Sequence, residues 1–240
     1  MVKISERLRT AAGLIGEGER LADVGTDHGY VPIYLVERKH IPSAIAMDIR
    51  TGPLERAREH IRMYGMEDYI QTRLSDGVAA LKPGEADTIL IAGMGGGLVM
   101  HILESGRAIC EQAHGLVLQP QSELPKVRRF LMENGYVTER EEMVMEDGKY
   151  YPMMRVHFDA SAVSHADSFT EEQELEFRYG KQLLTEKHPV LLAYLRWEAQ
   201  IQQDILTQLS GQPATEQIAA RIDDVKQILA QNARALAYYE

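Results

Sequence analysis

Short apolar runs alternate with amphipathic stretches over the first two thirds of the chain. The strand-like runs are residues 21–25, 43–49, 69–76, 87–93, 115–120, 137–146 and 153–159. Helical patterns at 30–39, 52–64, 97–112 and 123–134 follow the first, second, fourth and fifth of these runs. Apolar strands that alternate with helices are typical of a parallel sheet with helices on both faces. We therefore predict an α/β fold for a first domain, residues 1–165.

The last two strand-like runs leave no room for a helix between them. Asp147 and Gly148 lie in the short connection, and these residue types favour tight hairpin turns. We therefore expect an antiparallel hairpin at the edge of the otherwise parallel sheet.

From about residue 166 the chain becomes rich in Glu, Gln, Ala and Leu, which favour helices. Thr170 followed by Gln173 is typical of a capped helix start, and Pro189 suits the first turn of the next helix. Residues 210–213, Ser-Gly-Gln-Pro, interrupt that helix. We expect a second domain, residues 166–240, made of helices.

The last helix carries a heptad pattern, which predicts an antiparallel coiled coil with the helix before it. The positions of this seam are Ile218, Ile222, Val225, Leu229, Asn232 and Leu236, and the expected partners are Tyr194, Trp197, Ile201 and Ile205. Asn232 either fixes the register inside the seam or reaches solvent near the helix end. The coiled coil is also a candidate for weak self-association.

The composition excludes several classes of protein. The 240 residues include a single cysteine, so neither an intramolecular disulfide nor a CxxC metal site is possible, and we expect no metal. No apolar run reaches the ~18 residues of a membrane span, and the start does not resemble a signal peptide, so we expect a cytoplasmic protein without membrane contact.

The charge of the chain limits how it can bind nucleic acid. With 26 basic against 36 acidic residues the net charge is −10, which argues against a general nucleic-acid coat. The first 62 residues are more balanced, with 10 basic and 9 acidic residues. A local polyanion site is therefore expected near the N-terminus, where Lys3, Arg7 and Arg9 share a helical face.

The segment 21–30, LADVGTDHGY, predicts a ligand-binding loop between a strand and a helix. Gly25 allows a sharp turn after the strand, and Gly29 allows close packing under a ligand. A dinucleotide site would favour G-x-G-x-x-G, but Asp27 lies in this loop and would repel a pyrophosphate. A carboxylate suits the cationic S-adenosylmethionine (AdoMet) better, although a dinucleotide stays open at this point.

Aspartates end three successive predicted strands at Asp23, Asp48 and Asp76. Each alone is typical of a loop cap. Together, at one edge of a parallel sheet, they favour a ligand with ribose hydroxyls and an adenine amino group.

The fourth strand ends in IAGMGGG, residues 91–97, and its glycines predict an open loop with exposed backbone amides near a methyl acceptor. Cys110 lies within a predicted helix, away from the strand ends, which argues against C5 methylation of a pyrimidine through a cysteine nucleophile. No N/D-P-P-Y/F/W motif for amino-group methylation is present. A ring nitrogen such as adenine N1 needs mainly orientation, so it remains a suitable acceptor.

The motifs DVGTDHG, AMDI, RLSDG, IAGMGGG and GKYYPMM, followed by a helical tail, resemble the bacterial TrmK family of tRNA (adenine-22-N1)-methyltransferases. The resemblance implies a Rossmann-like AdoMet-dependent domain with a C-terminal coiled coil, AdoMet as methyl donor, and tRNA as substrate in the cytoplasm. The residues it implies around AdoMet are Asp23, Gly25, Thr26, Asp27, His28 and Gly29 for methionine, Asp48 and Ile49 for ribose, Asp76 and Gly77 for adenine, and Gly93, Met94, Gly95 and Gly96 for the reaction centre.

The candidates for catalysis are Asp27, His28, Gly93 and Met94. Asp27 either accepts a hydrogen bond from the adenine N6 group, which would stabilise the charge that develops on the ring, or contacts only the AdoMet amino group. Tyr30, which either stacks on a base or packs inside the protein, joins Lys3, Arg7 and Arg9 as an RNA-binding candidate.

Three other functions stay open from the sequence. They are a non-catalytic protein that binds AdoMet or RNA, a methyltransferase acting on another small acceptor, and a dinucleotide oxidoreductase. A test of methyl transfer to RNA would distinguish the first two from an RNA methyltransferase. The carboxylate of Asp27 counts against the third, because it would repel a pyrophosphate.

Overall fold

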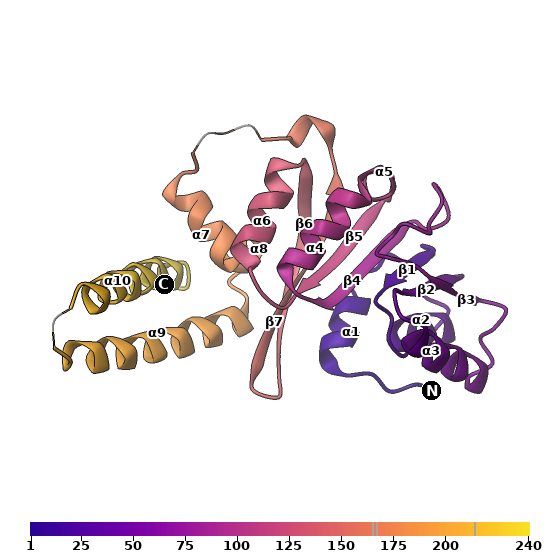
Figure 1. The fold of residues 1–240 in the computed structure, drawn as a ribbon, viewed down its shortest axis with the longest axis horizontal. Coiled ribbons are helices and arrows are strands. Elements are labelled where there is room, and N and C mark those ends of the chain that lie inside the picture. The colour runs from indigo at the N-terminus through magenta and orange to yellow at the C-terminus, as the bar shows by residue number, and fades with distance from the viewer. Residues whose placement is uncertain (165, 167, 214) are drawn as a thin grey trace. The chain divides into compact units, whose positions relative to one another are not determined.

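The computed structural model describes residues 1–164, 166, 168–213 and 215–240, and the chain divides into two compact units, Met1–Ser168 and Phe169–Glu240 (Figure 1). The predicted domain boundary falls at residue 165, which lies outside the described residues. The assignment of the two units as separate domains therefore stays a prediction.

The first unit is built on one seven-stranded sheet. Its strands are β1 (Leu21–Val24), β2 (Ala44–Asp48), β3 (Ile70–Leu74), β4 (Thr88–Met94), β5 (Gly115–Pro120), β6 (Tyr136–Glu146) and β7 (Lys149–Phe158), in the order β3-β2-β1-β4-β5-β7-β6. The first five are parallel, and β7 is antiparallel to both β5 and β6. The predicted α/β sheet with an antiparallel edge hairpin is confirmed.

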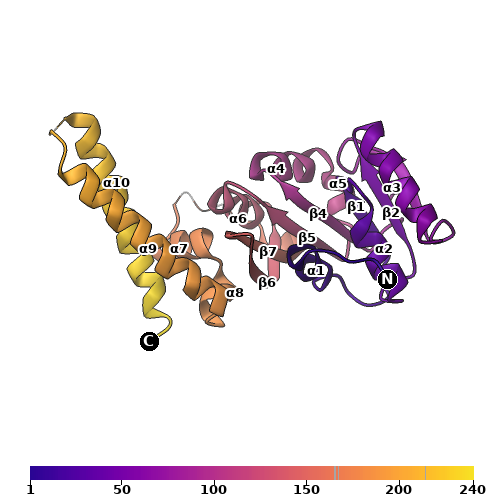
Figure 2. The same cartoon turned by 90° about the horizontal axis from the view of Figure 1, so that it is seen from below.

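Helices cover both faces of this sheet (Figure 2). One face carries α1 (Glu6–Ala12), α2 (Tyr30–Glu37) and α3 (Thr51–Met63), and the other carries α4 (Gly96–Ser105), α5 (Arg107–Cys110) and α6 (Leu124–Glu133). A 3-10 turn, Ala160–Ala162, follows β7.

The single helix expected over 97–112 is wrong, because the chain breaks at Gly106 between α4 and α5. A side chain at Gly106 would overlap Val78, so the backbone approaches its neighbour too closely for an ordinary helical residue.

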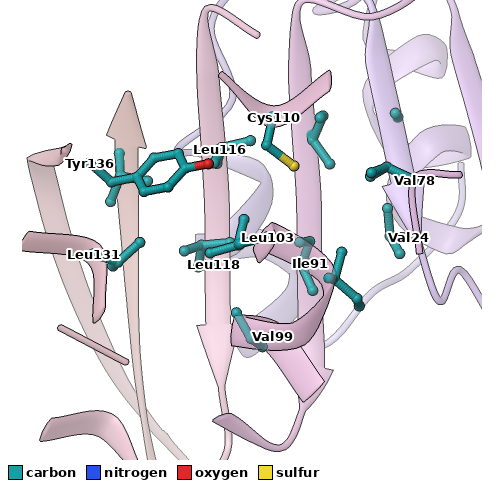
Figure 3. Packing of buried hydrophobic residues seen from close by; sticks show 14 of the residues in the cluster. Val24, Val78, Ile91, Val99, Leu103, Cys110, Leu116, Leu118, Leu131 and Tyr136 are labelled. Atoms are coloured by element: carbon teal, nitrogen blue, oxygen red, sulfur yellow. The ribbon is translucent and has the colours of Figure 1, made fainter. Parts of the chain in front are cut away.

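Successive residues of the central strands point to opposite faces, as the pleat of a strand requires. Val24, Ile91 and Leu118 pack against Val99 and Leu103 of α4 on one face (Figure 3).

Cys110 lies in the same cluster and is fully buried, and burial raises the pKa of its thiol to about 12. The thiol is therefore protonated and inert at neutral pH, which agrees with its exclusion as a nucleophile.

The edge hairpin turns at Asp147 and Gly148, which have φ of 49° and 72°. Glu146 pairs with Lys149, so the loop has two residues, both in the left-handed region that such turns require. The register of β6 against β7 shifts between Thr138 and Arg140.

The second unit contains α7 (Glu171–Tyr179), α8 (Lys181–Thr185), α9 (Pro189–Ser210) and α10 (Glu216–Ala237). The expected capping box is present, because Gln173 N donates to Thr170 Oγ1 at 3.1 Å and Thr170 N donates to Gln173 Oε1 at 2.9 Å. Pro189 occupies the first turn of α9 as predicted. The helices α9 and α10 lie side by side (Figures 1 and 2).

The seam between α9 and α10 differs from the predicted one. Trp197 and Ile201 are 50% and 39% exposed, whereas the buried face of α9 contains Leu191, Leu195 and Glu198. The prediction was wrong on this helix because it paired apolar side chains and did not expect a buried glutamate between them.

Asn232 is only 1% exposed, and its Nδ2 donates to Leu195 O and Glu198 Oε2, each at 2.9 Å. Of the two alternatives for this residue, the one that placed it in solvent is wrong.

Among the described helices, none is long and apolar enough to span a membrane. Within the same described part of the chain, no group of three or more His, Cys, Asp or Glu residues is placed to hold a metal ion.

Candidate functional site

The strand order reverses between β1 and β4, which are adjacent although they are not consecutive in the chain. Ligands of open α/β sheets bind at such a switch point, at the carboxyl ends of the strands. A pocket of about 250 Å³ lies there. Its lining residues are Arg7, Leu8, Asp23, Gly25, Thr26, Asp27, His28, Tyr30, Val31, Leu90, Ala92, Gly93 and Gln121.

The loop after β1 is held against the end of β2. The amides of Gly25 and Thr26 both donate to Met47 O, at 2.8 and 2.9 Å. Gly25, Asp27 and Gly29 have φ of 75°, 49° and 69°, so the chain turns through the left-handed region three times before α2 begins. This turn brings the loop under the pocket, and a side chain at Gly25 would overlap Met94 Cε.

Asp23 is a buried carboxylate at the floor of this pocket, with 6% exposure. Burial raises its pKa to about 6, a hydrogen bond from Thr26 Oγ1 at 2.6 Å opposes that rise, and the nearby charge of Asp48 adds to it. In the described part of the chain no basic side chain forms an ion pair with Asp23. A buried carboxylate that is ionised at neutral pH without a counter-ion favours a cationic ligand.

Asp48 and Asp76 lie along the same edge but outside the pocket lining. Asp48 ends β2, is buried, and accepts a hydrogen bond from Arg50 N at 2.8 Å. The carbonyl of Asp48 accepts from Ser75 N at 3.0 Å, which ties the end of β3 beside it. Asp76 follows directly and is exposed. The three strand-end aspartates therefore lie along the ends of β1, β2 and β3, as the sequence predicted.

Asp27 is exposed and pairs with an arginine of α3. Arg56 Nη2 of α3 donates to Asp27 Oδ1 at 2.7 Å, and His28 Nε2 lies 3.4 Å from Asp27 Oδ2. The rings of His28, Tyr30 and His60 form a cluster with centroids 5.0 to 5.3 Å apart. The contribution of α3 depends on tertiary packing, so no motif in the sequence could indicate it.

The glycine-rich segment runs from the end of β4 into the start of α4, and three of the amides that were expected to be free are hydrogen bonded. Gly93 N donates to Gln119 Oε1 at 3.2 Å, Gly96 N to Ser122 Oγ at 3.1 Å, and Gly97 N to Glu123 Oε2 at 3.1 Å. A side chain at Gly96 would overlap Ser122 O. Gly96 therefore lets two segments pack closely, and Gly93 is the glycine of this segment that lines the pocket.

The predicted site residues divide into three groups. The pocket brings together Asp23, Gly25, Thr26, Asp27, His28, Gly93, Arg7 and Tyr30. Outside its lining are Gly29, Asp48, Ile49, Asp76, Gly77, Met94, Gly95 and Gly96. Lys3 and Arg9 line a different pocket. Gln121 lines the first pocket without having been predicted, because a glutamine that ends a strand carries no distinctive signal.

Comparisons with known proteins agree with this arrangement. Residues 4–154 match the family model described as a methyltransferase domain. The chain is 34% identical over 236 residues to the tRNA (adenine(22)-N(1))-methyltransferase of Bacillus subtilis, covering 95% of this chain and 98% of the relative. The chain belongs to this methyltransferase family.

Solved structures of the TrmK family have the same fold. The crystal structure of the B. subtilis m1A22 tRNA methyltransferase TrmK has a TM-score of 0.81 at 32% identity, with 98% of this chain and 99% of that chain covered. A Streptococcus pneumoniae relative solved in complex with S-adenosyl-L-methionine has a TM-score of 0.78 at 32% identity, with 95% and 100% covered.

The pocket of this TrmK-family member fits the chemistry of S-adenosylmethionine. That ligand carries an ammonium and a sulfonium, and the buried Asp23 carboxylate lacks a counter-ion in the part of the chain that the structure describes. Gly25 has no side chain at the pocket, and a Cβ there would meet Met94 Cε.

Proposed function

We propose that this protein transfers a methyl group from AdoMet to N1 of adenine 22 in tRNA. The observation that carries the proposal is the buried Asp23 carboxylate, which forms no ion pair among the described residues, at the switch point of a chain that shares 34% identity with a tRNA (adenine(22)-N(1))-methyltransferase. The tRNA substrate implies a site of action in the cytoplasm.

The chain's own residues bind and orient the reactants in this proposal. Asp23 and the loop Gly25, Thr26, Asp27, His28 and Gly29 bind the methionine part, Asp48 and Ile49 the ribose, and Asp76 and Gly77 the adenine of AdoMet. Gly93, Met94, Gly95 and Gly96 lie at the reaction centre. The same assignment makes residues 1–165 the catalytic domain and 166–240 the helical domain.

Methyl transfer to adenine N1 requires no general base, because this ring nitrogen carries a free lone pair and no proton. AdoMet supplies an electrophilic methyl group, and the lone pair of adenine N1 forms the new N–C bond as the S–C bond breaks. S-adenosylhomocysteine leaves, and the adenine ring gains a positive charge. The exposed Asp27 carboxylate can accept a hydrogen bond from the adenine N6 group as this charge develops, so Asp27 stabilises the transition state. Orientation of the two reactants supplies most of the remaining rate.

Methyl transfer from labelled AdoMet to unmodified tRNA tests the proposal. Nucleoside mass spectrometry should detect 1-methyladenosine, and a tRNA with guanine at position 22 should remain unlabelled. Binding of AdoMet without transfer to any RNA would instead favour the non-catalytic alternative, and the absence of both would overturn the proposal.

Gly25→Ala should weaken AdoMet binding, and Gly18→Ala provides a matched control. Both glycines have a φ near 75°, at 75° and 78°, so alanine strains the backbone equally, by about 1 kcal/mol. Only at Gly25 would the new Cβ meet a neighbour, Met94 Cε, whereas nothing lies within 4 Å of it at Gly18. Calorimetry should show at least a roughly tenfold loss of AdoMet affinity for Gly25→Ala alone. Equal affinities in the two variants would remove Gly25 from the cofactor site.

The tRNA contact proposed near the N-terminus has a defined location. Lys3, Arg9, Tyr34 and Arg38, together with Val2 and Ile4, line a pocket of about 260 Å³ between the N-terminal segment and α2. The Arg38 guanidinium stacks 3.7 Å from the centre of the Tyr34 ring, which makes a cationic aromatic surface suited to a phosphate and a base.

The variant Arg9→Ala/Arg38→Ala should raise the KM for tRNA and reduce its dependence on salt, because two phosphate contacts are lost. The affinity for AdoMet should not change. A KM that stays at the native value at both low and high salt would place the RNA elsewhere. The self-association expected of the helical tail stays a prediction.

A further inference from the structure

Arg7 was expected on the RNA-binding surface, but its guanidinium lines the pocket at the ends of β1 and β4. Nη1 of Arg7 donates to Gln119 Oε1 at 2.8 Å, and the guanidinium carbon lies 5.6 Å from the centre of the Tyr151 ring. Gln119 is fully buried, and the same oxygen accepts a hydrogen bond from Gly93 N. Arg7 is therefore held in a fixed direction beside the segment that follows β4.

The half-buried Arg7 side chain has no acidic partner in the part of the chain that the structure describes. Two other partly buried arginines pair with a glutamate, Arg73 with Glu85 and Arg155 with Glu19. Among the described residues, the partners of the Arg7 guanidinium are the neutral amide oxygen of Gln119 and the aromatic ring of Tyr151. A partly desolvated cation without a counter-ion favours an anionic ligand.

The charges of AdoMet match the charges of the pocket. The ligand has one anionic group, the α-carboxylate of its methionine part. The described residues that line the pocket include the carboxylate of Asp23 and the guanidinium of Arg7. The first suits the ammonium of the ligand, and the second suits its carboxylate. If Asp48 and Asp76 bind the ribose and adenine over β2 and β3, the amino-acid end of the ligand points toward β4 and β5. Arg7 and Gln119 lie on that side.

We propose that Arg7 binds the α-carboxylate of AdoMet and that Gln119 is the positioning residue which directs the guanidinium toward it. A guanidinium can donate two parallel hydrogen bonds to a carboxylate, which gives the contact both strength and direction. The proposal rests on the proposed function in one respect, that AdoMet is the methyl donor.

Two ligands that differ only in the carboxylate provide the test. S-adenosylhomocysteine carries it, and S-adenosyl-3-thiopropylamine, its decarboxylated analogue, does not. Calorimetric titration of the native protein should give an affinity for S-adenosylhomocysteine at least about tenfold higher. Arg7→Met should abolish this difference and leave the affinity for the amine unchanged. Arg196→Met, which removes the same charge from an exposed position of α9, should retain the difference.

Gln119→Leu separates positioning from a purely structural role. It should reduce the preference for the carboxylate ligand while the affinity for the amine stays at the native value, which also shows that the pocket is folded. Equal affinities of the native protein for the two ligands, or an equal loss of both in Arg7→Met, would overturn the proposal and leave the proposed function standing. If the native protein binds neither ligand, the proposed function itself fails.

Discussion

The variant Asp23→Asn should be more stable than the native protein at neutral pH and should bind AdoMet more weakly. Asp23 is buried, and its pKa of about 6 lies about two units above its ordinary value. A shift of that size corresponds to about 3 kcal/mol at most that the ionised carboxylate costs the ligand-free fold above pH 6. Asparagine carries no charge, and its side-chain oxygen can still accept the hydrogen bond from Thr26.

The sign of the pH dependence follows from the direction of this shift. Between about pH 4 and pH 6 the folded protein keeps a proton on Asp23 that the unfolded chain has lost, so this residue makes native stability fall as the pH rises. The difference in unfolding free energy between Asp23→Asn and the native protein should therefore grow across this window and level off above it. Urea unfolding at pH 4, 5, 6 and 7 measures that difference, in which the other titrating groups cancel.

Binding should show the opposite preference. A cationic ligand interacts with the ionised carboxylate, so the affinity of the native protein for AdoMet should fall by up to about tenfold per pH unit below pH 6. Asp23→Asn should bind about a hundredfold more weakly at pH 7 and lose this dependence on Asp23. Unchanged affinity at pH 7 would show that the carboxylate does not contact the ligand. If Asp23→Asn is more stable but binds AdoMet as tightly as the native protein, Asp23 destabilises the fold without contributing to binding.

The fold and the location of the site follow from local signals in the sequence. The apolar runs at Asp23, Asp48 and Asp76 form β1, β2 and β3. The first two are buried throughout, as strands inside a parallel sheet are, whereas β3 lies at the edge and is partly exposed. Since parallel strands share one carboxyl edge, the ends of successive strands meet without any information about packing. The signal for the hairpin turn was also local, because Asp147 and Gly148 are residue types that adopt the left-handed conformation such a turn requires.

The features that sequence patterns missed depend on contacts between distant segments. Arg7 is hydrogen bonded to Gln119, which is distant from it in the chain, and neither belongs to a motif. The glycines of 93–97 indicated an open loop, yet Gly96 is required because a second loop, at Ser122, packs against it. Composition alone does not separate a glycine that makes room for a ligand from one that makes room for backbone.

Polar residues inside a helical seam are the second kind of miss. A heptad pattern pairs apolar residues, so it selected Trp197 and Ile201 on α9, whereas the structure buries Glu198 against Asn232 of α10. A glutamate is rarely buried unless it is paired, and the partners Arg178, Tyr179 and Asn232 come from two other helices, α7 and α10, which no single-helix pattern can indicate.

Glu198→Ala should destabilise the helical unit by about 3–5 kcal/mol, because it removes the centre of a buried network. Glu198 is 5% exposed and accepts hydrogen bonds from Arg178 Nη2 at 2.8 Å, Tyr179 Oη at 2.7 Å and Asn232 Nδ2 at 2.9 Å. Its removal leaves Arg178 without this carboxylate. Burial raises the pKa of Glu198, but the hydrogen bonds from Asn232 and Tyr179 and the charge of Arg178 outweigh it, so the pKa is lowered. Its stabilising contribution is therefore present at neutral pH and is lost only as the pH falls through that lowered pKa.

The chain's single tryptophan, Trp197, lies on α9 and makes fluorescence a local probe of this unit in the full-length protein. Urea unfolding followed by fluorescence should show the large loss for Glu198→Ala at pH 7 and a smaller difference at acidic pH. Ile201→Ala keeps the tryptophan and truncates a residue that the heptad pattern placed in the seam, but this side chain is 39% exposed and should cost no more than about 1 kcal/mol. If Ile201→Ala were the more destabilising of the two variants, the predicted apolar seam would be correct and Glu198 would contribute little to the pairing of the helices. The expected order instead means that a polar network, and not the apolar heptad, sets how α9 and α10 pair.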